Sequence, residues 1–169
     1  NFGSLQFNTT GNVTVFEDSA TDLRGANTGS RIEVTSSSAV TDQAGTSITA
    51  SAGAAITGTS ITLTDNSNES VSITGDAVFT ATTGNIAVNS AGSTLFGTLQ
   101  FNSPGLVTIF EDSQTVLKSS SSAGTLQLTS SALLTSESGI GLSVGNNATL
   151  TGTSISLGSA ATDNLQING

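Results

Sequence analysis

The chain has 169 residues, 35% of them hydrophobic, and contains no Cys, His, Trp, Tyr or Met. Without Cys or His it has no disulfides, none of the usual zinc or haem ligands and no His-based catalytic triad. Twelve acidic and three basic residues give a net charge of −9. This excludes the clustered Lys and Arg needed to bind nucleic acid or anionic lipid, and no apolar run is long enough to cross a bilayer.

Short segments in which apolar and polar residues alternate recur along the chain and predict β-strands. In chain order the clearest are 5–7, 13–16, 32–34, 48–50, 61–63, 71–73 and 86–88. Each places two apolar side chains on one face, the period-2 pattern of a half-buried strand. With weaker members included, a segment occurs every ~8 residues, about twelve in 94. No stretch has a helical period, so we expect an all-β protein.

The sequence also matches itself at an offset of 94 residues. Residues 2–8 return at 96–102, residues 13–19 return at 107–113, and the register holds to the last residue. Repeat unit 1 is therefore 1–94, and repeat unit 2 is 95–169 and incomplete. Because the chain begins within the pattern, we expect it to be part of a longer protein, with both units in one continuous structure.

Two all-β architectures fit this rhythm. The favoured one is a parallel β-solenoid (β-helix) with about three short strands per coil, about seven coils, and four coils of about 23 residues in each repeat. The alternative is a string of Ig-like β-sandwiches, whose usual size is close to 94 residues. The shortness of the strands, the single Pro104, and a sub-repeat that links 45–49 to 58–62 favour the solenoid.

Three segments, 1–8, 17–23 and 57–63, resemble a known kind of sequence. They are similar to the β-strand repeats of giant secreted bacterial surface proteins of planctomycete and cyanobacterial type, and more distantly to filamentous-haemagglutinin adhesins. The resemblance covers nearly the whole chain. It implies a structural or adhesive protein, outside the cell or on its surface, that forms a rod or filament with further copies of itself or with adjacent repeats, stacked head-to-tail or laterally.

The best acidic candidates lie in the Glu-Asp-Ser motif and its copy. Glu17, Asp18 and Asp22, with Glu111 and Asp112, offer hard oxygen ligands that could bind calcium, the one cofactor we consider. The alternative is a turn in which these side chains cap backbone N–H groups. The second copy has Val116 where the first has Asp22, which favours the turn.

The same sequence bears on two other classes of function. A calcium- or glycan-binding module, with surface glycans as partners, is the alternative to the structural protein. An enzyme is the least favoured reading, because no cleft-forming cluster of charged residues can be located. We expect Phe7 and Phe16, and their copies Phe101 and Phe110, to fill the core or the ends of coils rather than to stack on sugars.

Overall fold

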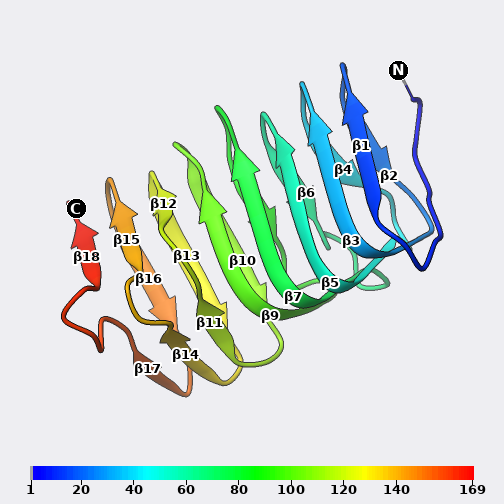
Figure 1. Cartoon of the computed structure of the whole chain (residues 1–169). Helices are drawn as coiled ribbons and strands as arrows, with labels where there is room; N and C mark the ends of the chain where they lie inside the picture. The colour runs from blue at the N-terminus through cyan, green and yellow to red at the C-terminus, as the bar shows by residue number, and fades with distance from the viewer. Residues whose placement is uncertain (1) are drawn as a thin grey trace.

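The computed structural model describes residues 2–169 and shows a parallel β-solenoid (Figure 1). Over this range it contains strands and no helix, and so no helix that could span a membrane. The strands are β1 (Val13–Glu17), β2 (Thr21–Leu23), β3 (Ala26–Ser36), β4 (Val40–Asp42), β5 (Ser47–Gly58), β6 (Ile61–Leu63), β7 (Ser70–Ala81), β8 (Ile86–Val88), β9 (Ser93–Asn102), β10 (Leu106–Glu111), β11 (Thr115–Leu117), β12 (Ser121–Ala123), β13 (Thr125–Ser130), β14 (Leu133–Ser136), β15 (Gly141–Val144), β16 (Ala148–Thr151), β17 (Ser154–Ser156) and β18 (Asn164–Ile167). The predicted fold class is confirmed.

The coil has three sides, which we number by their strands. Side III is the seven-stranded sheet in the order β16-β13-β10-β8-β6-β4-β2. Strands β3, β5, β7 and β9 bend round a corner (Figure 1), so their first halves form side I and their second halves side II. Beyond β9 the corner shifts, because β11 and β12 both pair with the second half of β9, at Leu99 and Asn102. From there on we call the stack of β11, β14 and β17 side I and the stack of β12, β15 and β18 side II. Each strand pairs in parallel with its neighbours one coil away, which confirms about seven coils.

Period-2 alternation produces one apolar core that runs the length of the stack. Inward side chains lie directly above their counterparts in the preceding coil: Ile56 pairs in register with Phe79, and Phe79 with Phe101, all at most 1% exposed. Phe79 also meets Phe96 edge-to-face, with ring centroids 5.6 Å apart. Apolar side chains stacked on apolar side chains remove one another from water along the whole interior. In this way a chain of low aromatic content obtains a core.

The sequence repeat does not equal a whole number of coils. On side III, four successive coils carry the register from Thr21 through Val40, Ile61 and Ile86 to Val107. The sequence copy of Thr21 is not Val107 but Thr115, which begins β11, the next strand of the chain, on side I. One repeat is therefore longer than four coils by one side.

Each repeat thus advances four coils and one side. Strand β1 lies on side II and its sequence copy β10 on side III; β2 lies on side III and its copy β11 on side I. Pairing inside a unit is unchanged, since Val13 pairs with Ile32 and the copies Val107 and Leu126 pair likewise. The sequence predicted four whole coils per repeat, which is one side fewer than the structure shows. The prediction fell short because the turns differ in length and the count of strand-like segments missed one segment.

The orientation of Phe16 differs from the prediction. In β1 the side chains of Val13, Val15 and Glu17 point inward, and Phe16 points outward with 76% of its surface exposed. Phe110 likewise points outward in β10 and is partly exposed. The prediction was correct for Phe101, which is fully buried. Strict alternation allows only one of two adjacent residues to face the core, and in both copies the glutamate does so.

Candidate functional site

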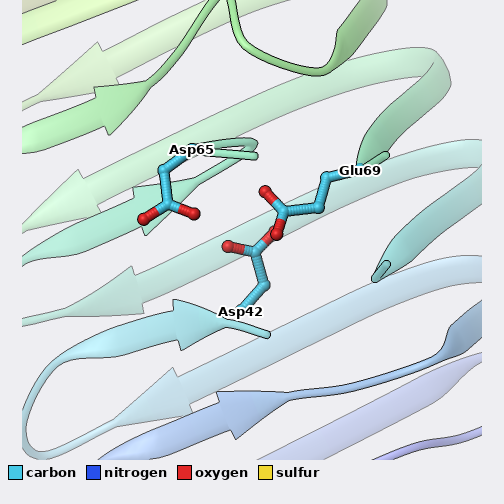
Figure 2. A group of neighbouring side chains, drawn as sticks. All are labelled: Asp42, Asp65 and Glu69. Carbon is cyan, nitrogen blue, oxygen red and sulfur yellow. The ribbon is translucent and has the colours of Figure 1, made fainter. Parts of the chain in front are cut away.

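Three carboxylates from adjacent coils meet at one edge of side III. Asp42 ends β4, while Asp65 and Glu69 lie in the loop between β6 and β7. Figure 2 shows the carboxylates of Asp42 and Glu69 facing each other with Asp65 beside them, and ligand oxygens of all three lie within 4.8 Å of one another. Among the residues that the structure describes, these three side chains form the one group of three or more Asp, Glu, His or Cys residues that could hold a metal ion.

The loop is shaped by its own hydrogen bonds. Asn66 donates from its backbone N–H to Glu69 Oε2 (2.8 Å) and from its amide to Glu69 Oε1 (2.9 Å) and Asp65 Oδ1 (2.6 Å). Thr64, in the left-handed region at φ 55°, donates its N–H to Asp42 Oδ2 (3.2 Å) and its hydroxyl to the Asn89 carbonyl (2.8 Å). These contacts hold the loop against Asp42 and keep the three carboxylates together.

The cluster is electrostatically unfavourable as it stands. Burial, reinforced by the charges of Glu69 and Asp65, raises the pKa of Asp42 to about 7, although the Thr64 amide lowers it. Asp42 Oδ1 is buried and has no hydrogen-bond partner. The arrangement would be relieved by a proton or by a hard cation, because either supplies the positive charge that the oxygens lack.

The raised pKa of Asp42 predicts a pH-dependent stability. Between the ordinary value of 3.8 and about 7 the folded state binds a proton that the unfolded state does not. The stability contributed by this bound proton is complete below the pKa of Asp42 in the unfolded state and is lost as the pH rises through about 7. We therefore expect Asp42→Asn to have a higher melting temperature than the wild type at pH 8, by a few degrees, and a smaller decrease between pH 5 and pH 8.

Thermal melts followed by circular dichroism measure this, with Glu137→Gln as the control. Glu137 is exposed, and its counterpart in the first repeat is already Gln43, so this variant should follow the wild type at both pH values. Burial also raises the pKa of Glu111, so some pH dependence should persist in Asp42→Asn. A variant no more stable than the wild type at pH 8 would show that folding does not raise the pKa of Asp42.

The glutamates of the Glu-Asp-Ser motif cap backbone amides. Glu17 is 4% exposed and accepts the N–H of Phe2 at 2.9 Å; its copy Glu111 is fully buried and accepts the N–H of Phe96 at 3.0 Å. In each copy the serine two residues on donates its hydroxyl to the same carboxylate. This repeated contact ties the end of one strand to a segment 15 residues earlier and gives the motif a structural role in both copies.

The other predicted calcium ligands are dispersed. Asp22, on side III, accepts hydrogen bonds from Thr41 Oγ1 (3.3 Å) and Gln43 Nε2 (2.5 Å), while Asp112 Oδ2 accepts the N–H of Thr94 (2.8 Å). Together with Glu17, Asp18 and Glu111, these residues lie outside the carboxylate group at Asp42. Calcium binding at the Glu-Asp-Ser motif remains a prediction.

Sequence reasoning missed the actual cluster. The available signal was the coil length, because Asp42 and Asp65 are separated in the sequence by the length predicted for one coil. Their counterparts in the second repeat are Ser136 and Ser159, and that of Glu69 is Asp163. The cluster therefore occurs once in the chain, and a function carried by every repeat cannot depend on it.

Comparison of the chain with protein-family models, with curated proteins and with solved structures found no match.

Proposed function

We propose that the chain is a structural or adhesive repeat protein that forms a rod or filament outside a bacterial cell or on its surface. The fold supports the mechanical part of the proposal, because stacked coils share one core and one set of parallel ladders across the boundary between the repeats. Such a rod is stiff along its axis and lengthens as coils are added. The extracellular and bacterial parts rest on the sequence resemblance.

The observation that carries the proposal is that each coil buries an apolar surface against the next coil of the same plan. Leu165 and Ile167 in β18 are 42% and 48% exposed, whereas their counterparts Val71 and Ile73 in the first repeat are each 1% exposed beneath the next coil. A coil of the same plan fits this surface, from adjacent repeats or from a second copy stacked head-to-tail. Strand addition to the free edge would satisfy its backbone groups at the same time.

The proposal assigns no catalytic activity to the chain, and no nucleic acid or membrane partner. The acidic character supports the absence of those two partners, because a net charge of −9 repels both nucleic acid and anionic lipid. Two of the three basic side chains are already paired, Arg31 with Glu33 and Lys118 with Asp76.

The proposal predicts concentration-dependent end-to-end association. Sedimentation velocity should show species that grow with concentration, and negative-stain micrographs should show filaments of uniform width. Ile167→Asp places a charge in the stacking surface and should abolish growth, because burying an unpaired carboxylate is costly. Leu95→Asp, at a 43% exposed residue on side I, should leave head-to-tail growth intact. A monodisperse wild-type monomer at all concentrations would contradict the proposal.

A calcium-binding module is the second candidate function, favoured by the carboxylate group of Asp42, Asp65 and Glu69. A cation that binds the folded state must stabilise it by mass action, by about 2.7 kcal/mol at one hundred times its dissociation constant. Calcium at pH 8 should therefore raise the melting temperature of the wild type and not that of Asp42→Asn. An unchanged wild-type melting temperature in millimolar calcium would exclude the module.

A further inference from the structure

The outward phenylalanine is specific to one position of the repeat. In register with Phe16, the next three coils of side II carry threonine: Thr35, Thr57 and Thr80. Threonine therefore suffices for the sheet surface at this position, and a large aromatic group gains little there because most of its area stays in water. Both copies of the repeat nevertheless carry Phe. Aromatic side chains contribute strongly to interfaces, so an outward phenylalanine at this position offers a contact surface to a partner.

Polar groups surround the ring. Phe16, Asp18, Thr35 and Ser37 line an open depression of about 460 Å³ on the surface. The depression therefore offers a flat apolar face with hydroxyl groups and a carboxylate at its margin. Hydroxyl groups both donate and accept hydrogen bonds, and a carboxylate accepts them.

The second repeat keeps the same residue types. The counterparts of Phe16, Asp18, Thr35 and Ser37 are, in that order, Phe110, Asp112, Thr129 and Ser131. Phe110 pairs in register with Thr129 as Phe16 does with Thr35. The Asp42 cluster is lost in the second repeat, whereas this set is retained.

This set of groups matches the chemistry of a sugar ring. A pyranose presents a C–H face that packs on an aromatic ring, and hydroxyl groups that bond to surrounding hydroxyls and carboxylates. The net charge of −9 disfavours anionic polymers and lateral contact with a second copy of the chain. An uncharged polysaccharide is thus the partner that fits.

We propose that Phe16 and Phe110 are the centres of two binding sites for neutral polysaccharide, one in each repeat. The inference rests on the proposed adhesive function and specifies its partner. Because β1 lies on side II and β10 on side III, the two sites face different directions. They are four coils and one side apart along the chain, a rise of about 21 Å at the spacing of hydrogen-bonded strands.

The different directions determine what binding does. A straight polysaccharide lying along one side of the rod reaches one site and not the other, so the two sites bind separate polymer chains. The protein then cross-links polysaccharide instead of gripping one strand with both sites. In a longer array of the same repeat, the sites would rotate by one side per repeat and return to the first side after three repeats.

Affinity electrophoresis tests the sites. Native gels containing laminarin, hydroxyethylcellulose or galactomannan should slow the wild-type chain in at least one case, and gels containing alginate, an anionic polymer, should not. The double variant F16A/F110A should lose at least about tenfold in affinity, as expected for removal of an aromatic stacking platform. Leu95→Ala, which removes another exposed apolar side chain, should behave as the wild type does.

Three results would overturn the proposal. The wild-type chain could be slowed in none of the three neutral gels, it could be slowed only by alginate, or the double variant F16A/F110A could be slowed as much as the wild type.

Cross-linking is measured by light scattering, with the polysaccharide that slows the chain in the gels. The protein carries Ile167→Asp and is used at concentrations where it sediments as a monomer. Protein with both sites intact should form aggregates with the polysaccharide that scatter light. Protein with either Phe16→Ala or Phe110→Ala should bind the polysaccharide without forming aggregates. Aggregation by either single variant would overturn the two-direction arrangement. Filaments without polysaccharide binding would refute only the sites, and binding without filaments only the rod.

Discussion

Gly97→Ala should reduce the free energy of unfolding by about 3 kcal/mol or more. Gly97 lies in β9 at the corner between sides I and II, and a Cβ atom there would lie 2.0 Å from the Thr74 carbonyl oxygen and 2.9 Å from that of Gly75. Both oxygens belong to the backbone of the preceding coil, held at the strand spacing of about 4.8 Å. The two coils would have to separate, which breaks the ladder on both sides of the corner.

The chain supplies its own control, because Gly3 is the sequence counterpart of Gly97. A Cβ atom at Gly3 would meet nothing within 4 Å, so Gly3→Ala should change stability by less than about 0.5 kcal/mol. Equilibrium unfolding in urea, followed by circular dichroism, gives both values. Equal effects at the two positions would mean that the coils are not stacked with this register.

Phe79→Ala should cost about 3–5 kcal/mol, the range for removing a buried phenylalanine. Its side chain is fully buried, in register between Ile56 and Phe101, with the Phe96 ring against it. The cavity cannot close easily, because the coils above and below are fixed by their hydrogen-bonded ladders. Urea unfolding measures the loss.

Phe16→Ala is the matched control for this prediction, since the same substitution is made at a side chain that is 76% exposed. It should change stability by less than about 0.5 kcal/mol. Comparable losses in the two variants would place the Phe16 ring in the core, as the sequence alone suggested, and would remove the basis for a binding surface there.

Much of the fold could be predicted from local pattern. Segments 61–63 and 86–88 were expected as strands and are β6 and β8 with those limits. Period-2 alternation identifies such segments because each strand buries one face. The corners were not predicted: β5 and β7 run for 12 residues each round the bend between sides I and II. The glycines at these bends, Gly53 and Gly75, are typical of a turn between separate strands, and so they do not by themselves indicate a strand that continues through the bend.

The candidate sites were harder to predict for a related reason. Asp42 meets Asp65 and Glu69 only because a coil step brings together residues that are far apart in the sequence, and the length of that step varies along the chain. The inward position of Glu17 was unexpected because hydrophobicity favours burying its neighbour Phe16. The amide of Phe2, 15 residues earlier, stabilises the buried carboxylate, and a contact of that range does not show in the local sequence.

The most direct test of a single continuous solenoid is the distance between spin labels at Thr41 and Thr149, measured by double electron–electron resonance. Both residues lie on side III, joined in register through Thr62, Ala87, Thr108 and Gln127. Five strand spacings predict a narrow distribution centred at about 24 Å. A broad distribution, or one centred at a much longer distance, would contradict the solenoid and indicate two separate domains.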